Sequence, residues 1–229
     1  ADLSKLTTLR NLYLNENDFS GTIAADLLEL TALERLILDE NEISGTIAAD
    51  LSELTALRVL ALAATEISGT IAADLSKLTA LQSLILNSND FSGTIPADLS
   101  ELTALRVLYL DENDFSGTIA ADLSKLTTLR NLYLNENDFS GTELTAFERL
   151  WLNGNEISGT IPRQIGKLSQ LETLDFTFMA LTGPIPESFG GLDPEICALQ
   201  EGNPELSCYE GEINVPTYEG ISDFRESTS

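Results

Sequence analysis

The stretch that decides the fold runs from Leu99 to Asp122 and reads LSELTALRVLYLDENDFSGTIAAD. Leucines recur in it at intervals of two and three residues. The Leu108-Tyr109-Leu110 alternation has a period of two, which predicts a short strand with Tyr109 outward and its neighbours buried. Ser116-Gly117 predicts a turn, because glycine accepts the crowded or left-handed backbone of a tight corner.

The same stretch recurs along most of the chain, so the sequence is a tandem repeat. One coil cannot bury its apolar side alone, whereas stacked copies can. An Asn follows the strand in most coils, as at Asn113, and we expect an inward Asn to bond to the backbone of the next coil. Six coils begin 24 residues apart, at Leu3, Leu27, Leu51, Leu75, Leu99 and Leu123.

This pattern resembles the plant-type leucine-rich repeat, whose coils read LxxLxxLxLxxNxLSGxIPxx, over roughly residues 3 to 188. Repeats of that type build the ectodomains of plant receptor kinases and polygalacturonase-inhibitor-like proteins, and occur widely in secreted algal proteins. The resemblance implies an α/β solenoid of about eight 24-residue coils, with a parallel concave sheet and an irregular or 3-10 convex side. It names no ligand. One departure is that Ala often replaces the Pro of the I-P step, which remains only at Pro96, Pro162 and Pro186.

The sequence predicts three segments: the solenoid (1–188), a C-terminal cap (189–211) and an acidic irregular tail (212–229). The only two cysteines, Cys197 and Cys208, lie in the cap. A pair that closes a small loop beyond a solenoid predicts a disulfide, with two free thiols as the alternative. No apolar run reaches ~18 residues, so we expect no membrane span in this fragment. Because the chain opens in the middle of a repeat, we interpret it as a mature or truncated fragment.

The repeat slips after Thr142, where an expected I-x-A-D-L-S is absent before Glu143. Residues 1–22 and 121–142 are identical, which indicates a recent duplication or near-identical modules. A real deletion would remove two apolar core side chains, at ~2–5 kcal/mol each. Our hypothesis is that the natural protein contains these six residues.

The chain carries 12 basic and 37 acidic residues, a net charge of −25. Nucleic acid is excluded as a partner because phosphate binding needs a basic surface. An anionic membrane surface is disfavoured for the same reason. Basic proteins or peptides and divalent ions fit this charge, and so does plain solubility of an extracellular protein.

The outward middle position of each strand forms a column across the concave sheet. Aromatic side chains exposed side by side are common at binding surfaces, whereas cross-strand packing that only stiffens the sheet is the alternative. Next to this column runs an acidic edge. The candidate ligand-binding residues are Tyr13, Ile37, Ile85, Tyr109, Tyr133 and Trp151 from the column, with Asp111, Glu112 and Glu136 from the edge.

Other repeated side chains favour structural roles. The acidic pairs indicate a solvated rim rather than a calcium site, since no Asp-x-Asp-x-Asp-Gly loop occurs. The Thr of each S-G-T-I step, as at Thr22, indicates a hydroxyl ladder, with binding of ice or a crystalline polymer as the alternative. A row of arginines favours local ion pairs over an anion site. It consists of Arg10, Arg58, Arg106 and Arg130.

The sequence gives no support to catalysis. It contains no His, no G-x-S-x-G motif and no phosphate loop. We therefore predict no enzyme, no cofactor and no metal. The chain is predicted to be an extracellular or cell-surface recognition module that binds a basic protein or peptide, or a glycan, on its concave face. The alternative is a structural scaffold of a surface, wall or appendage that assembles through lateral contacts.

Overall fold

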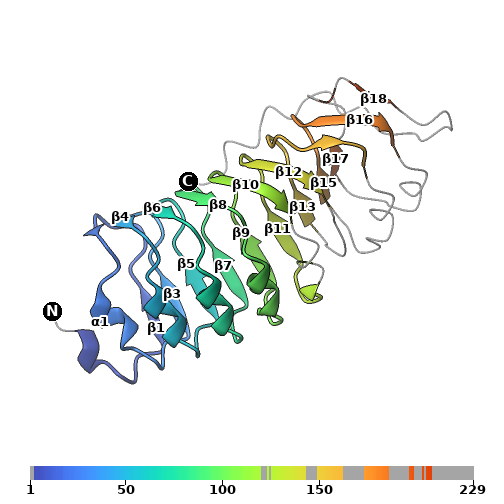
Figure 1. Ribbon diagram of the computed structural model, residues 1–229. Coiled ribbons are helices and arrows are strands. Elements are labelled where there is room, and N and C mark those ends of the chain that lie inside the picture. The colour runs from blue at the N-terminus through green and yellow to red at the C-terminus, as the bar shows by residue number, and fades with distance from the viewer. Residues whose placement is uncertain are drawn as a thin grey trace.

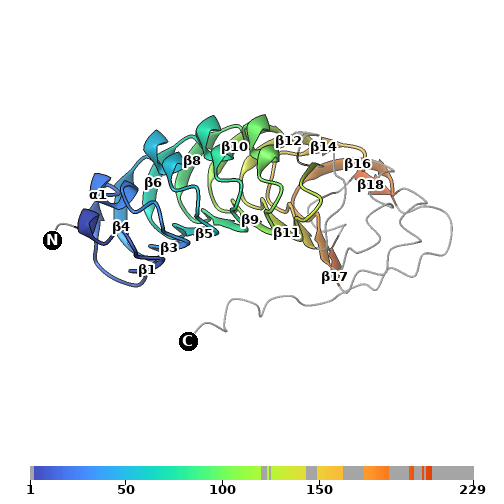
Figure 2. The same cartoon turned by 90° about the horizontal axis from the view of Figure 1, so that it is seen from below.

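The computed structural model describes residues 3–119, 123, 125–142, 149–161, 173–185, 196–198, 203 and 205–207. Coils stack side by side along one axis, starting from the N-terminal coil at one end (Figure 1). Seen from below, the strands of the main sheet line one side of the stack and the short helices lie on the opposite side (Figure 2). The predicted α/β solenoid is confirmed.

The main sheet is parallel, and its strands follow one another in chain order. Equivalent residues pair, so that Leu108 stands in register with Leu84 on one side and Leu132 on the other. Each strand is three residues long, which matches the short L-x-L alternation of the repeat. The strands are β1 (Asn11–Tyr13), β3 (Arg35–Ile37), β5 (Val59–Ala61), β7 (Ser83–Ile85), β9 (Val107–Tyr109), β11 (Asn131–Tyr133), β13 (Arg149–Trp151), β15 (Thr173–Asp175) and β17 (Ile196–Ala198).

Among the described residues the main sheet has nine strands, where the sequence predicted eight. The ninth, β17, lies in the segment that was assigned to a cap, and it pairs in register with β15. It escaped prediction because its Ile196-Cys197-Ala198 sequence lacks the leucines that mark the other strands. The disulfide prediction lies outside the described residues, because Cys208 is not among them.

The other side of the coils carries short helices and a second set of strands. The one-turn helices are η1 (Leu3–Lys5), α1 (Ala25–Leu28), η2 (Ala49–Glu53), η3 (Ala73–Lys77) and η4 (Ala97–Glu101). The second set of strands is β2 (Ser20–Gly21), β4 (Glu42–Gly45), β6 (Glu66–Gly69), β8 (Asp90–Gly93), β10 (Asp114–Ile119) and β12 (Asp138–Thr142), followed by a separate sheet of β14 (Ser158–Gly159), β16 (Ala180–Pro184) and β18 (Glu205–Ser207). The prediction of an irregular or 3-10 convex side is thus right for the helices but misses this second set of strands.

The break between β12 and β14 coincides with the shortened repeat. Across the same boundary the main sheet continues without interruption, since Asn131 pairs with Arg149 only 18 residues later. The concave register therefore survives a coil that is six residues short. The hypothesis that six residues are absent here concerns the Thr142–Glu143 junction, which lies outside the described residues.

The core confirms the strand register. Leu108 and Leu110 are fully buried, whereas Tyr109 is only partly buried. On β8, β10 and β12 of the second set of strands, the buried rings of Phe91, Phe115 and Phe139 stack on one another, with centroids 6.0 and 6.2 Å apart. Aligned aromatic side chains therefore continue the leucine core from coil to coil.

An inward Asn joins most pairs of adjacent coils, with Thr65 and Met179 at this position in two coils. Asn113 Nδ2 donates to the carbonyl oxygen of Leu86 in the preceding coil at 3.1 Å, and to that of Leu110 in its own coil at 3.2 Å. Its Oδ1 accepts from the backbone N–H of Phe91 at 2.9 Å. The predicted role is right, but the bonds run to the preceding coil rather than the next. The same pattern recurs at Asn41, Asn89, Asn137, Asn155 and Asn203.

We expect Asn113→Ala to lower the free energy of unfolding by about 2–4 kcal/mol, because it leaves several buried backbone groups without partners at ~1–3 kcal/mol each. Thr65 is the matched control, since it occupies the Asn position in its coil and donates to Leu62 O at 3.2 Å. Thr65→Ala should cost less than half as much in urea denaturation. Equal losses for the two variants would contradict the role given to the amide.

In four S-G-T steps, at Gly45, Gly69, Gly93 and Gly117, the threonine of the preceding coil leaves no room for a side chain on the glycine. Gly117 has a φ of +83°, and a Cβ built on it would lie 2.9 Å from the methyl Cγ2 of Thr94. The threonine methyl therefore occupies the space that any side chain at Gly117 would need. Gly159, beside the shortened coil, has a φ of +95° but nothing within 4 Å of such a Cβ.

This contrast predicts two different costs for the same substitution. Gly159→Ala should lower stability by about 1–2 kcal/mol, the cost of a left-handed backbone for an L-residue. Gly117→Ala adds an overlap with Thr94, and overpacking costs a further ~1–3 kcal/mol. Chemical denaturation of both variants measures the difference. The Gly117→Ala, Thr94→Ser double variant should recover the packing part of the loss.

Candidate functional site

The concave face is built from the outward side chains of the main-sheet strands. The third position of each strand forms one column, in which every residue is paired in register with the next. Tyr13 at the N-terminal end is 55% exposed, Ala61 is 2% exposed, and the other members are partly buried. The column reads Tyr13, Ile37, Ala61, Ile85, Tyr109, Tyr133, Trp151 and Asp175.

Three consecutive members of this column form an aromatic ridge, namely Tyr109, Tyr133 and Trp151. The Tyr109 and Tyr133 rings stack at 4.3 Å between centroids, with 16° between their planes. Trp151 is tilted by 48° from Tyr133, with centroids 5.6 Å apart. Burial raises the pKa of the Tyr133 hydroxyl, and the nearby Tyr109 adds to this. The structure thus brings together three of the predicted site residues and holds each ring against its neighbour.

The remaining predicted members of the column lie away from the ridge. Tyr13 is at the far N-terminal strand, and Ile37 is next to it on β3. Ile85 adjoins Tyr109 and borders the ridge on its N-terminal side. The predicted column residues therefore divide into the three rings of the aromatic ridge and three residues that do not stack with them, namely Tyr13, Ile37 and Ile85.

A second column follows two residues after the first. Asp39 Oδ1 accepts from the backbone N–H of Ala63 in the next coil at 2.7 Å. Burial raises the pKa of Asp39, while this bond opposes the rise. Asp111 holds the equivalent place beside the ridge, and its buried Oδ1 has no partner among the described residues. Burial, with smaller contributions from Glu112 and Glu136, raises the pKa of Asp111 to about 7.

Each coil turns away from the concave face at the next residue, which adopts a left-handed backbone. Glu112 and Glu136 have φ values of 53°, and Gly154 takes the same place with 67°. Both glutamates are exposed, and the Ser88 hydroxyl donates to Glu112 Oε2 at 2.8 Å. The predicted acidic edge is therefore a row of carboxylates at the corners of the coils.

Two polar residues near Trp151 were not among the predicted site residues. Asp175 is in register with Trp151 on β15, and its Oδ1 accepts from the backbone N–H and the hydroxyl of Thr177 at 2.9 and 2.8 Å. Asn153 Oδ1 and Trp151 Nε1 are buried and have no hydrogen-bond partner within the described part of the chain. In the repeat, Asp175 holds the same position as Trp151 one coil later, and Asn153 follows Trp151 by two residues; this spacing is the signal that would have selected them.

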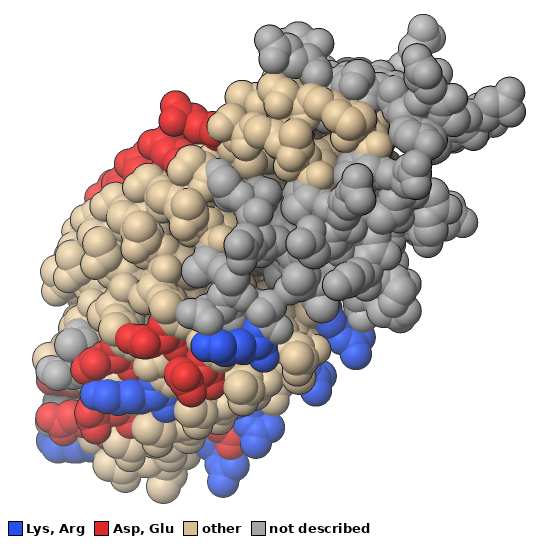
Figure 3. All heavy atoms as spheres, turned by 45° about the vertical axis from the view of Figure 1, so that its right-hand side comes forward, with Lys and Arg blue, Asp and Glu red and all other residues tan. Residues whose placement is uncertain are grey.

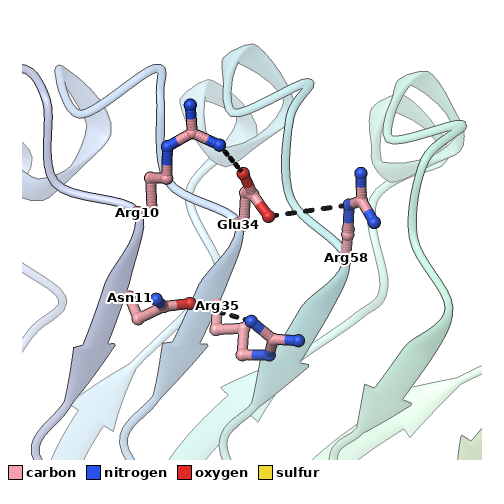
Figure 4. A network of polar contacts seen from close by, with 5 residues as sticks. All are labelled: Arg10, Asn11, Glu34, Arg35 and Arg58. Carbon is pink, nitrogen blue, oxygen red and sulfur yellow. Dashed lines mark hydrogen bonds and ion pairs between the residues drawn. The ribbon is translucent and has the colours of Figure 1, made fainter.

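The arginine row forms ion pairs at the N-terminal coils. Arg10 Nη1 lies 2.6 Å from Glu34 Oε1, and Arg58 Nε lies 3.8 Å from Glu34 Oε2 (Figure 4). One residue further along the chain than Glu34, Arg35 on β3 donates to Oδ1 of Asn11 on β1 at 3.0 Å. The local pairing predicted for Arg10 and Arg58 is confirmed.

The convex face carries the threonine column. Thr22, Thr46, Thr70, Thr94 and Thr118 are exposed, and their methyl groups face the next glycine from Thr22 through Thr94. Figure 3 shows an uncharged band on this side, between a row of acidic residues and a region where basic and acidic residues mix. Packing against glycine gives the threonines a structural role.

Within the described ranges, no group of three or more His, Cys, Asp or Glu side chains is arranged to hold a metal ion. The helices of the same ranges are all too short or too polar to cross a membrane.

The leucine-rich-repeat family model matches residues 80–102, 104–126, 146–168 and 170–192. The matched segments are leucine-rich repeats, and the chain folds as a leucine-rich-repeat solenoid. No curated protein matches it significantly by sequence. Among solved structures, it is similar to the leucine-rich-repeat ectodomain of the plant membrane receptor kinase GASSHO1/SCHENGEN3 from Arabidopsis thaliana, in complex with CASPARIAN STRIP INTEGRITY FACTOR 2. The identity is 30% and the TM-score 0.83, over 90% of this chain and 25% of that one.

A second similar structure is the Arabidopsis receptor kinase HAESA in complex with the peptide hormone IDA and the co-receptor SERK1. It has 29% identity and a TM-score of 0.84, over 91% of this chain and 39% of that one. The leucine-rich-repeat chain thus spans well under half the length of these two proteins. A plant ice-binding protein shares the fold at 23% identity and a TM-score of 0.68, over 91% of this chain and 78% of that one.

The raised pKa of Asp111 predicts a pH-dependent stability. The folded-state pKa is about 7, and that of an unfolded Asp is ~3.9. The protonated Asp111 therefore stabilises the folded state fully below pH ~4, and this stabilisation is lost as the pH rises through about 7. Its size is ~1.4 kcal/mol for each unit by which the folded-state and unfolded-state pKa values differ. Asp111→Asn should unfold at higher denaturant than the unchanged protein at pH 8 and at about the same denaturant at pH 4. Asp138→Asn, at an exposed position of β12, is the control.

Proposed function

We propose that this chain is a non-enzymatic, extracellular recognition module that binds a protein or peptide on its concave face, with the aromatic ridge at the centre. The observation that carries the proposal is the stacked Tyr109, Tyr133 and Trp151 on three adjacent strands. Rigid aromatic side chains at an open surface supply large contact area at low entropic cost. The concave sheet face also accepts an extended segment across its strands.

The similar structures support this reading. The GASSHO1/SCHENGEN3 ectodomain is in complex with CASPARIAN STRIP INTEGRITY FACTOR 2, and HAESA is in complex with a peptide hormone and a co-receptor. Both are receptor kinases of plants, and the first is described as a membrane receptor. A peptide or protein ligand and an extracellular location follow for this chain by analogy.

Charge favours a basic partner. The net charge is −25, and the carboxylates of Glu112 and Glu136 stand next to the ridge. Opposite charge speeds association and excludes acidic competitors. A glycan is the weaker choice, because Tyr109 and Tyr133 cover each other's faces and sugars pack on open ring faces.

Trp151→Ala should weaken peptide binding by about 30-fold or more, since central aromatic anchors contribute ~2 kcal/mol or more. Tyr13→Ala is the matched control, because Tyr13 stands in the same column, is exposed and lies away from the ridge. It should change affinity less than about twofold. Peptides selected from a random display library on the unchanged protein serve as probes, and affinity is measured by fluorescence anisotropy. Binding that survives Trp151→Ala unchanged would overturn the proposal.

A second candidate function is a structural scaffold. Two 22-residue stretches are identical, and an exposed acidic row follows the outer edge of the coils. Such a row would assemble through divalent ions. The row consists of Asp18, Glu42, Glu66, Asp90, Asp114, Asp138 and Glu156. Sedimentation velocity with calcium and with a chelator separates the two functions: only the scaffold forms calcium-dependent assemblies that tolerate Trp151→Ala.

A further inference from the structure

The aromatic ridge is flanked by acidic residues on both sides. Toward β15, the residue in register with Trp151 is Asp175 rather than a ring, and Thr177 fixes the orientation of its carboxylate. Toward β7 the column continues with Ile85. Asp111 lies beside the β9 end of the ridge, two residues after Tyr109 in the same coil, and Glu112 stands at the adjoining corner. Each end of the ridge thus combines an aromatic side chain with at least one carboxylate.

Within the described ranges, buried polar atoms without a hydrogen-bond partner lie at both ends, among them the donor Trp151 Nε1. Asp111 Oδ1 and Asn153 Oδ1 are buried without a partner among the described residues. An unpaired buried acceptor is unfavourable, and a donor from a ligand relieves it. The terminal torsion of an Asp side chain is soft, so either carboxylate oxygen of Asp111 can turn toward a ligand. Arg149, the nearest basic residue on β13, hydrogen-bonds with Tyr133 and is thus already engaged.

We infer that the two ends of the ridge bind two arginine side chains of one extended peptide, one against Trp151 and Asp175 and the other against Asp111 and Glu112. This inference rests on the proposed function and specifies its ligand. It assigns the ligand chemistry to named positions of the concave face.

Arginine fits these ends better than lysine. Its planar guanidinium stacks on an aromatic face while its N–H groups donate within the plane to surrounding oxygens. An ammonium group is a point charge on a flexible stem and cannot stack while it forms a bidentate bond. At Trp151 the guanidinium would lie on the indole and donate to Asp175. At Asp111 it would donate to two carboxylates at once.

The spacing of the two ends defines the motif. Asp111 and Asp175 belong to coils that are three strand intervals apart, from β9 to β15. At ~4.8 Å per interval this is ~14 Å across the strands, and Asp111 also lies two residues, or ~7 Å, further along the strand direction than Asp175, so the two are ~16 Å apart. Four residues of an extended chain advance ~13 Å, and the long arginine side chains cover the remaining ~3 Å. Residues four apart also point to the same side of an extended chain, and the predicted motif is R-x-x-x-R.

Binding of the cation should release a proton. Burial, Glu112 and Glu136 raise the pKa of Asp111 to about 7. The neighbouring coil positions, Asn87, Ser88 and Asn135, carry no charge. A guanidinium beside Asp111 favours its ionised form and lowers this pKa again. The affinity for the peptide should therefore rise between pH 6 and pH 8.

The test uses Gly-Ser peptides that carry two arginines four positions apart, compared with peptides in which the arginines are two apart and with the lysine counterpart. Isothermal titration in two buffers of different ionisation enthalpy gives affinity and proton release. The R-x-x-x-R peptide should bind at least about fivefold more tightly than either comparison and release a proton at pH 7.

Asp111→Asn and Asp175→Asn should each reduce this preference at least about threefold, and only Asp111→Asn should abolish the proton release. Asp39→Asn, at the position equivalent to Asp111 but away from the ridge, should change neither. A lack of preference for arginine or for the spacing overturns this inference. If peptides selected from the library lose binding in Trp151→Ala yet show no such preference, the proposed function stands and only the inference fails. If Trp151→Ala binds the same peptides as tightly, the proposed function fails as well.

Discussion

The buried asparagine between adjacent coils is the interaction on which the rest of the structure depends. A coil must turn sharply after each concave strand, and the turn leaves carbonyl and N–H groups where water does not reach. One amide satisfies groups of two coils at once, as Asn113 does for Leu86, Leu110 and Phe91. Because the same amide recurs in most coils, with Thr65 and Met179 as the exceptions, it holds most coils in one register against their neighbours. The alignment of every exposed column follows from that register.

The concave face is a consequence of this alignment. Aromatic residues at positions 109, 133 and 151 are far apart along the chain, yet they stack because the three strands are paired residue for residue. The shortened coil does not disturb the stacking, since Tyr133 and Trp151 remain in register across it. The second set of strands on the other side is divided at that coil. The two sides of the solenoid therefore tolerate a change of coil length differently.

Much of this could be predicted from the sequence, because burial in a repeat follows its period. The period of Leu108-Tyr109-Leu110 gave the correct inward and outward faces, and the spacing of the coils gave the correct columns. The second set of strands was missed, because Ser-Gly-Thr has the composition of a turn and its pairing depends on a neighbouring coil. Strand β17 was missed because Ile196-Cys197-Ala198 does not match the repeat. The environment of Asp111 could not be predicted from the sequence either. Asp39 holds the same position in the repeat, yet its Oδ1 accepts a hydrogen bond from Ala63, whereas Asp111 Oδ1 has no partner among the described residues.

The left-handed corner after each concave strand has a consequence for how the molecule opens. In the described part of the chain, seven non-glycine residues occupy this corner, namely Glu16, Glu40, Ala64, Ser88, Glu112, Glu136 and Phe178. An L-residue is held there against its own preference by ~1–2 kcal/mol, so only contacts with the neighbouring coils keep it in place. When a terminal coil detaches, its corner relaxes at the same moment as its leucines become exposed. The strain thus lowers the cost of unzipping the stack one coil at a time from an end, and it makes the interior coils, which have neighbours on both sides, the most persistent part of the solenoid.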